Sequence, residues 1–298
     1  MNVESSQDAP LHIPVMTEEV ISLLEIIPDG IYVDGTVGLG GHATRILDQL
    51  SPRGKLIGID LDGEALQYCN QTLATSSSHF SLIHNTFDQL PRILSKLEIN
   101  DVNGILLDLG ISSDQLNSEK RGFSFSGSGP LDMRFDRTYR RTAADVVNKL
   151  SESKLADIIF TYGEERRSRI IAKKINQVRP LITVPELTEA VRSCTPPNYR
   201  NRTLARVFQA LRITVNDELE KLETFLKHFI NVLAIGGKVV IISFHSLEDR
   251  LVKQNFRQLS QNGLLKILTK KPLRPSIDEC ATNNRSRSAK LRAAERIF

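Results

Sequence analysis

Three aspartates, each at the end of an apolar run, are the residues whose types and positions most clearly indicate ligand chemistry. Asp34 ends "GIYVD", Asp60 ends "KLIGID" and Asp108 ends "GILLD". Buried carboxylates without partners are costly, so three of them in equivalent positions need a common explanation. A cationic ligand rich in hydroxyl groups would satisfy all three. Asp60 in particular is suited to accept hydrogen bonds from both hydroxyls of a ribose.

A glycine-rich turn follows the first of these aspartates and fits two different cofactors. The segment "GLGGHA" at residues 38–43 matches the dinucleotide pattern G-x-G-x-x-A. The segment "DGTVGLG" at residues 34–40 matches the turn D-x-G-x-G-x-G of S-adenosylmethionine enzymes, with Thr36 in place of the first glycine. The Asp34 carboxylate would oppose a pyrophosphate, whereas it is compatible with a sulfonium and an ammonium group. Asp34 therefore favours S-adenosylmethionine, and a nicotinamide dinucleotide is the alternative.

Two of the candidate cofactor residues have structural alternatives. Asp60 could instead cap the helix "DGEALQYCN", although Asp62 is equally placed to do so, and capping by one acid can coexist with ribose binding by the other. Phe87 follows the third apolar run in "HNTFDQL". Its ring would lie on an adenine or pack in the core, and the sequence leaves both alternatives open.

A parallel sheet is needed to bring the three aspartates together, and the first third of the chain has the pattern of one. Apolar runs alternate with amphipathic segments, from "GIYVDG" and "GHATRILDQL" to "FDQLPRILSKL" and "VNGILLDLG". This alternation predicts βαβ units in an α/β fold, with the ligand outside the carboxyl ends of the strands. After Asp108 the alternation ends in a long loop rich in glycine and serine, "GISSDQLNSEKRGFSFSGSGPLDMRFD".

The second half of the chain divides into a helical part and a return to the sheet. From Thr142 to Arg212 every periodic segment is helical, which indicates a helical domain inserted into the α/β domain. The helix "NDELEKLETFLKHFINVLA" then ends at Gly236-Gly237, and "KVVIISF" is a strand rich in β-branched residues. Two late runs, "LLKILTK" and "AAERIF", are expected to form a closing antiparallel pair.

The charge is distributed unevenly along the chain. The formal net charge is +4, but residues 1–111 carry 5 basic and 15 acidic side chains, a net charge of −10. Residues 112–210 have a net charge of +7, residues 211–263 of +1 and residues 264–298 of +6. Two basic stretches beside an acidic one indicate a polyanionic partner such as nucleic acid, although solvated helix faces are also often rich in lysine and arginine.

Bulk properties set the class of protein. The 298 residues, 40% of them hydrophobic, are enough for one large or two ordinary domains. The sequence contains no apolar run long enough for a membrane span and no signal peptide, so a cytoplasmic protein without membrane contact is expected. The three cysteines are far apart and unpaired in pattern, which predicts ordinary thiols, no disulfide framework and no metal site.

A set of long motifs resembles one family of enzymes. "HIPVMTEEV", "DGTVGLGGH", "DLGISSDQL", "GPLDMR", "YGEER", "FQALRITVNDEL", "ISFHSLEDR" and "RSAKLRAAER" together look like the RsmH (MraW) family, and the match runs from about His12 to Arg296. Members of this family are bacterial methyltransferases that modify a cytidine of small-subunit ribosomal RNA on its exocyclic amino nitrogen. The resemblance implies a class I S-adenosylmethionine-dependent methyltransferase fold, a Rossmann-like and mostly parallel sheet, with an inserted all-helical domain.

The resemblance also implies a cofactor, a substrate and a set of contacts. S-adenosylmethionine is the methyl donor, and the substrate is the decoding region of the small-subunit RNA, within an assembled or assembling subunit. Carried over residue by residue, the cofactor contacts are Gly40, Gly41, His42, Asp60, Phe87, Asp108 and Gln115. The family usually has His-Pro-Ala-Thr where this chain has Arg202-Thr203-Leu204-Ala205, so inferences about RNA contacts there do not transfer.

The catalytic group is not identified by the sequence, and Asp108 and His245 are the candidates. A cytidine amino nitrogen is a poor nucleophile, and it needs hydrogen-bond acceptors and alignment with the donor methyl group. Asp132 and Arg134 of "GPLDMR" and Ser243 and His245 of "ISFHSLEDR" are predicted to line the cytidine pocket, with a helix start as the alternative for His245. No cysteine follows a strand-end motif, which argues against a covalent ring-carbon mechanism.

The predicted domains and RNA contacts complete the expectations. Residues 1–11 form a flexible N-terminus, residues 12–115 and 207–298 the methyltransferase domain, and residues 116–206 an inserted helical domain that recognises the substrate. The loop phenylalanines Phe123 and Phe125 would stack bases or, slightly more in keeping with their spacing, pack in the core. Cations of the tail "NNRSRSAKLRAAER" would contact phosphates. The sequence does not determine the oligomeric state, and a homodimer is an open alternative.

Overall fold

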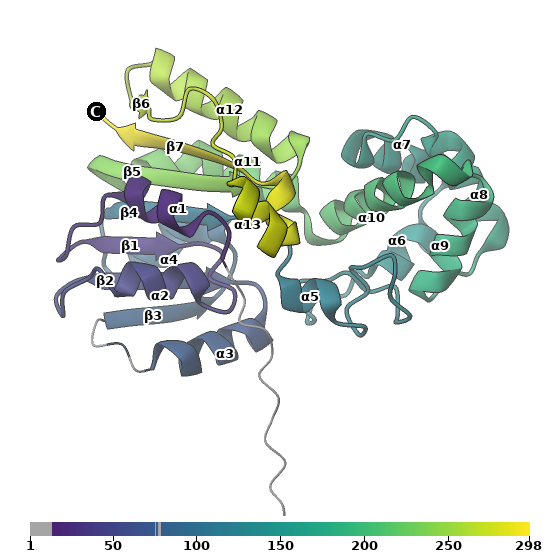
Figure 1. Ribbon diagram of the computed structural model, residues 1–298, viewed down its shortest axis with the longest axis horizontal. Helices are drawn as coiled ribbons and strands as arrows, with labels where there is room; N and C mark the ends of the chain where they lie inside the picture. Colours follow the sequence, from purple (N-terminus) through teal and green to yellow (C-terminus); the bar gives the residue numbers. More distant parts are fainter. Residues whose placement is uncertain (1–13, 75, 77–78) are drawn as a thin grey trace, which may run out of the picture. The chain divides into compact units, whose positions relative to one another are not determined.

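The computed structural model of the chain describes residues 14–74, 76 and 79–298, which fall into two compact units (Figure 1). The first unit contains the chain up to Leu109 together with His228–Phe298, and the second contains Gly110–Lys227. The sequence placed these divisions after residues 115 and 206, and the second of those positions lies inside an unbroken helix, Arg200–Asn216. The predicted flexible N-terminus, residues 1–11, lies outside the described residues.

A seven-stranded sheet forms the centre of the first unit. Its order is β3-β2-β1-β4-β5-β7-β6, in which all neighbours are parallel except β7, which pairs antiparallel with both β5 and β6. The strands are β1 Ile31–Asp34, β2 Lys55–Asp60, β3 His79–His84, β4 Val102–Asp108, β5 Leu233–Ser243, β6 Leu265–Ile267 and β7 Lys290–Arg296. The parallel α/β sheet and the closing antiparallel pair predicted from the sequence are both confirmed.

Helices cover both faces of this sheet. In Figure 1, α1, α2 and α3 lie in front of the sheet and α4 lies behind it, as right-handed crossovers between parallel strands require. The helical elements of the unit are α1 Thr17–Leu24, α2 Gly41–Leu47, α3 Gly63–Leu73, η1 Phe87–Gln89, α4 Leu90–Lys96, η3 Phe229–Asn231, α12 Ser246–Gln261, α13 Ile277–Thr282 and η4 Asn284–Ser288. The face under α1 to α3 is packed with Tyr32 of β1 and with buried aliphatic side chains from β2, β4 and β5.

The second unit is helical. Its helices are α5 Ser113–Asn117, α6 Ala143–Lys149, α7 Glu152–Gly163, α8 Ser168–Val178, α9 Val184–Ser193, η2 Pro197–Tyr199, α10 Arg200–Asn216 and most of α11 Glu218–His228. A separate hydrophobic core holds them together, with Phe208 and Leu211 of α10 packed among aliphatic residues of α6 to α9. The predicted helical character of this part of the chain is confirmed.

One predicted helix end is wrong. The helix expected to end at Gly236-Gly237 ends at His228, and both glycines lie inside β5. Gly236 has φ +79°, a left-handed conformation, and the pairing of β4 with β5 shifts register between Val102 and Gly104. These glycines therefore accommodate an irregular strand start, and helix termination is provided by Phe229–Asn231. Among the described residues, no helix is long and apolar enough to cross a membrane.

Candidate functional site

The turn between β1 and α2 contains glycines with left-handed backbone conformations, and it passes close to α3. Gly38 and Gly40 have φ values of +51° and +90°, a region that disfavours side chains. A Cβ atom at Gly40 would also lie 2.9 Å from Sγ of Cys69 on α3. Gly40 is the N-cap of α2, and its carbonyl accepts a hydrogen bond from the Thr44 amide at 2.8 Å. The turn thus needs glycine for both backbone conformation and space.

Asp60, at the end of β2, is hydrogen-bonded to this turn. Its Oδ2 accepts a hydrogen bond from the Gly38 amide at 2.8 Å, and its Oδ1 accepts one from the Asp62 amide at 2.8 Å. A carboxylate has about four lone-pair positions, so acceptor capacity is left for a ligand. Burial raises the pKa of Asp60 to about 6, although the hydrogen bonds from the Asp62 and Gly38 amides act to lower it. Asp62 is the residue that caps α3, by accepting from the Glu64 and Ala65 amides, so ribose binding by Asp60 is compatible with capping.

Asp34 and Asp108 end the neighbouring strands β1 and β4. Thr36 joins these strand ends, because its amide donates to Asp34 at 3.1 Å and its hydroxyl accepts from the Asp108 amide at 2.7 Å. Burial raises the pKa of Asp34 to about 7, and the nearby charges of Asp108 and Asp60 act in the same direction. The three predicted acids therefore lie at one edge of the sheet. The bridging role of Thr36 was missed from the sequence, where its occurrence at a glycine position was the available signal.

Buried polar atoms without partners mark this edge of the sheet. His42 on α2 is 5% exposed, and neither of its ring nitrogens has a hydrogen-bond partner among the described residues. Its Nε2 lies 3.7 Å from Oδ2 of Asp108, which is too long for a hydrogen bond. Oδ1 of Asp108 also has no partner there. Since buried polar groups in proteins are nearly always paired, these atoms indicate a ligand that supplies the missing hydrogen bonds.

Phe87 and Cys69 line the same turn from other elements. Phe87 begins η1 after β3 and is half-buried. A Cβ atom added at Gly35 would lie 3.1 Å from the Cβ of Phe87. Burial, reinforced by the charges of Asp34 and Asp60, raises the pKa of the Cys69 thiol to about 12. Cys69 is therefore a protonated packing residue beside the turn. The sequence did not indicate that Cys69 lies beside Gly40. With its pKa raised this far, the thiol is not a nucleophile.

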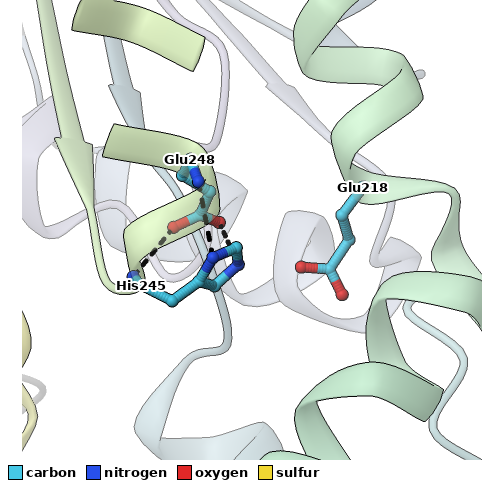
Figure 2. Close-up of side chains that lie close together, drawn as sticks. All are labelled: Glu218, His245 and Glu248. Carbon is cyan, nitrogen blue, oxygen red and sulfur yellow. Dashed lines mark hydrogen bonds and ion pairs between the residues drawn. The ribbon is translucent and has the colours of Figure 1, made fainter. Parts of the chain in front are cut away.

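Ser243 is the last residue of β5, and His245 follows two residues later. Ser243 is fully buried, and its hydroxyl has no partner among the described residues. His245 is the N-cap of α12 (Figure 2): its Nδ1 accepts from the Glu248 amide at 3.4 Å, and the Glu248 carboxylate accepts from the His245 amide at 3.3 Å. The helix-start alternative for His245 is thus the observed one. With Nδ1 as acceptor, the ring proton of the neutral imidazole is on Nε2, 3.1 Å from Glu248 Oε1.

The remaining predicted site residues belong to the second unit. Gln115 lies on α5, where its side chain accepts from the Ser112 amide at 3.1 Å and completes a capping box. Arg134 makes a bidentate ion pair with Asp132, at 2.7 Å and 2.8 Å, and also donates to the carbonyls of Arg137 and Tyr139. Burial raises the pKa of Asp132, but the hydrogen bonds and charge of Arg134 outweigh it and leave that pKa lowered. This pair organises the loop before α6.

The core alternative for Phe123 and Phe125, which their spacing slightly favours, is the observed one. Phe123 is buried and stacks on Phe135 with ring centroids 5.5 Å apart, and Phe125 packs against Phe208, so these rings belong to the helical core. In the tail, Arg292 is 6% exposed and donates to Asp249 at 2.7 Å. Lys290 contacts the same carboxylate at 3.3 Å. Core packing accounts for Phe123 and Phe125, whereas the contact of the tail cations with phosphates stays a prediction.

The donor and acceptor set at the sheet edge fits S-adenosylmethionine. Asp60 has acceptor capacity for ribose hydroxyls, and three clustered acids suit a ligand with two positive groups. His42 and Asp108 present buried atoms that need partners. A dinucleotide would instead bring its pyrophosphate to the same carboxylates, which would repel it.

The parallel sheet with its antiparallel seventh strand, and the acid-lined turn at its carboxyl edge, define a class I S-adenosylmethionine-dependent methyltransferase. The comparison with family models agrees, because the MraW methylase family matches residues 9–297. The chain belongs to this family. Family membership decides between the two cofactors that the sequence left open, in favour of S-adenosylmethionine.

Several relatives are similar over nearly their whole length. "Ribosomal RNA small subunit methyltransferase H" of Trichodesmium erythraeum is 50% identical over 290 residues, which cover 96% of this chain and 99% of the relative. The protein of the same name from Kosmotoga olearia is 47% identical over 292 residues, with 96% and 97% covered. A solved rRNA methylase from Streptococcus thermophilus is a distant match, with 12% identity and a TM-score of 0.47 over 99% of this chain and 100% of that one.

Proposed function

We propose that this chain transfers a methyl group from S-adenosylmethionine to the exocyclic amino nitrogen of a cytidine in the decoding region of small-subunit ribosomal RNA. The names of relatives that are 44–50% identical support the RNA substrate. The resemblance of the sequence motifs to the RsmH (MraW) family supports the cytidine and its amino nitrogen. The substrate is the RNA within an assembled or assembling small subunit, so the enzyme acts in the cytoplasm.

The observation that carries the proposal is the set of unsatisfied atoms beside the glycine turn. We assign cofactor binding in the first unit to Gly40, Gly41, His42, Asp60, Phe87 and Asp108. Asp60 would accept from the ribose hydroxyls, Phe87 would contact the adenine, and the acids would balance the positive groups of the cofactor. Gln115 belongs to the second unit, and its contact with the cofactor stays a prediction from the resemblance.

The chemistry needs an acceptor at the amino nitrogen rather than a nucleophile on the protein. Bound S-adenosylmethionine supplies a methyl group on a sulfonium, which is a good leaving group. Oδ1 of Asp108 is buried without a partner and can accept an N–H of the cytidine, which favours a more pyramidal nitrogen with an available lone pair. Positioning of this kind supplies several kcal/mol of the barrier in enzymes that align two reactants. Asp108 is therefore our first candidate for the catalytic residue.

His245 is a weaker candidate for a base than the sequence indicated. Its Nδ1 accepts from the Glu248 amide, so protonation at Nδ1 would break the cap of α12. Its Nε2 already carries the proton of the neutral ring. We propose that His245, with Ser243, contacts the cytidine through hydrogen-bond donors. The contacts of Asp132 and Arg134 with the cytidine, and substrate recognition by the helical unit, stay predictions.

The test is incubation with radiolabelled S-adenosylmethionine and small ribosomal subunits that lack this modification, followed by digestion to nucleosides. The proposal predicts label in N4-methylcytidine. Label in a ring-carbon methylcytidine, or in no nucleoside, would contradict it. Asp108→Ala is expected to retain S-adenosylmethionine binding within about tenfold and to lose methyl transfer. Full transfer by both Asp108→Ala and His245→Ala would reject the two catalytic candidates.

A further inference from the structure

We propose that the ends of helices α8, α9 and α10 in the second unit form a phosphate-binding surface for ribosomal RNA. This inference rests on the proposed function, because it assumes that the substrate is RNA. The surface consists of Arg166, Arg169, Lys174, Arg192 and Arg202, and we call it the arginine surface. It involves none of the residues assigned to the cofactor or the cytidine.

Hydrogen bonds hold the three helix ends together. Arg167, the N-cap of α8, donates to the carbonyl of Cys194 at the end of α9 at 3.2 Å. Arg200, the first residue of α10, donates to the carbonyl of Thr195 at 3.3 Å. Thr203 on α10 donates to Glu165, just before α8, at 3.2 Å. The residues that flank these contacts therefore lie at one end of the helical unit.

The cations at this end have no acidic partners. Arg166, Arg169, Arg192 and Arg202 are exposed and Lys174 is half-buried. In the part of the chain that the structure describes, none of their five side chains makes a hydrogen bond or an ion pair with another residue. Other basic side chains are paired with acids, as Arg212 is with Glu218 at 2.9 Å and Arg292 with Asp249 at 2.7 Å. Unpaired cations in such number indicate a polyanionic ligand.

The acid nearest to these cations is already engaged. Glu165 is 4% exposed, and its carboxylate accepts from the Arg167 amide, from Thr203 and from Arg206 at 3.0 to 3.3 Å. It fixes the geometry of the helix ends and cannot turn outward to neutralise the arginines. Two further acids are exposed nearby in the sequence, Glu164 at the C-cap of α7 and Glu189 on α9, so five cations against two acids keep the positive balance.

The two helix starts at this end reverse the usual charge preference. Acidic residues favour the first turn of a helix because the N-terminal end of its dipole is positive. In this unit α6, α7 and α9 each have an acid in the first turn. The first turns of α8 and α10 have none and contain Arg169 and Arg202 instead. Arginines placed against the dipole are unfavourable for the helix alone, and an anion bound there would relieve the repulsion.

An exposed aromatic ring accompanies the charges. Tyr199 ends η2 directly before α10, and 58% of it is exposed. Single-stranded or looped RNA is bound by cations that contact phosphates together with aromatic rings on which bases stack. An acidic protein surface would use the same cations but gain nothing specific from the exposed ring. The combination therefore favours RNA.

The experiment compares a triple variant, Arg166→Gln, Arg169→Gln and Arg202→Gln, with the unaltered protein. Binding of a fluorescent small-subunit rRNA fragment is measured by anisotropy at several salt concentrations, without S-adenosylmethionine, and methyl transfer is measured on small subunits. Each lost phosphate contact lowers the salt slope by about 0.7 for single-stranded RNA, so three should lower it by about 2. We expect at least a tenfold increase in Kd and KM, with kcat within about twofold.

A matched control separates this surface from general electrostatics. The control variant, Lys227→Gln, Lys253→Gln and Arg257→Gln, removes three exposed and unpaired cations on α11 and α12. It should keep the salt slope. A second triple variant, Arg166→Lys, Arg169→Lys and Arg202→Lys, should keep most of the affinity, because phosphate contacts depend mainly on charge. No variant should unfold at a lower temperature, since the altered side chains have no partners, and the triple glutamine variant should be slightly stabilised by removal of Arg169 and Arg202 from the helix starts.

The outcomes are separable from those of the proposed function. If the triple glutamine variant keeps the Kd and salt slope of the control, the arginine surface does not bind RNA. An unaltered affinity for RNA together with lost binding of an acidic ribosomal protein would also reject the proposal. If the unaltered protein methylates no cytidine, the proposed function fails, whatever the variants do to RNA affinity.

Discussion

The carboxyl edge of the sheet and the loop before α6 contain the same kinds of residue but differ in how their polar atoms are satisfied. At the sheet edge, His42, Asp108 and Ser243 have buried atoms without partners among the described residues. In the loop, Asp132 and Arg134 satisfy each other through two short hydrogen bonds. Both sets were candidate ligand residues in the sequence. Hydrogen-bond satisfaction, rather than residue type, separates the ligand site from the structural pair.

The largest effect on cofactor affinity is expected from Asp60→Ala. The nearby carboxylate of Asp62 caps α3 and provides the comparison. Loss of two charge-assisted hydrogen bonds to a ribose, each worth about 1.5 to 3 kcal/mol, should weaken S-adenosylmethionine binding by about 10²-fold or more. Asp62→Ala is the matched control, because it removes the cap of α3, at about 1 kcal/mol of stability. It should change the cofactor Kd by less than about threefold. Calorimetric titration of both variants with S-adenosylmethionine measures the two Kd values. Equal losses of affinity would contradict the assignment of ribose binding to Asp60 and of capping to Asp62.

Arg134→Ala tests the other side of the comparison. It leaves the half-buried Asp132 carboxylate without its bidentate partner and should lower the free energy of unfolding by about 3 kcal/mol. The Kd for S-adenosylmethionine should stay unchanged. Chemical denaturation and calorimetric titration check the two parts separately. A loss of cofactor affinity without a loss of stability would show that this pair is a ligand site after all.

His42→Ala should have the opposite pattern to Arg134→Ala. Removal of a buried ring with two unpartnered nitrogens should leave the melting temperature unchanged or slightly raised. The cofactor affinity should fall by about tenfold, because the ligand loses a hydrogen bond. Thermal unfolding with and without S-adenosylmethionine measures both effects. A large drop in the melting temperature of the free protein would instead assign His42 to the core.

The pH dependence sharpens the comparison with a smaller effect. Burial raises the pKa of Asp34 to about 7 and that of Asp60 to about 6, far above their values in the unfolded chain. Between about pH 4 and 7 the folded state therefore holds protons that the unfolded state has released, and the stability of the free protein falls as pH rises through this window.

A cationic cofactor favours the ionised acids, so its affinity should rise by about threefold to tenfold between pH 6 and 8. Titrations in buffers with different ionisation enthalpies should detect proton release on binding. In Asp34→Asn both the pH dependence and the proton release should be reduced. Proton uptake on binding by the unaltered protein would contradict the assignment of these acids to a cationic ligand.

The sequence predicted most of the sheet edge because its signals are local and strong. Apolar runs that end in Asp34, Asp60 and Asp108 identify strand ends, and parallel pairing brings such ends together regardless of long-range detail. The helix stop at Gly236 was wrong for a physical reason: glycine with positive φ serves an irregular strand as well as a helix end. Pattern alone does not distinguish the two.

The roles of other residues depended on partners that sequence spacing does not reveal. Nothing local in "GPLDMR" indicates that Arg134 folds back on Asp132 and reaches carbonyls further along the loop. The capping boxes of Gln115 and His245 were readable, since each has the N-cap and N3 spacing of that motif. For His245 that signal agrees with the helix-start alternative.

The packing of Cys69 against the glycine turn has a practical consequence for labelling. Its thiol is fully buried, and its pKa of about 12 leaves almost no thiolate at neutral pH. Cys280, by contrast, is only half-buried. Cys194 is half-buried as well. In a Cys194→Ser variant, a maleimide dye or spin label should therefore attach at Cys280 while Cys69 stays unmodified. Modification of Cys69 would report that the turn beside Gly40 has opened.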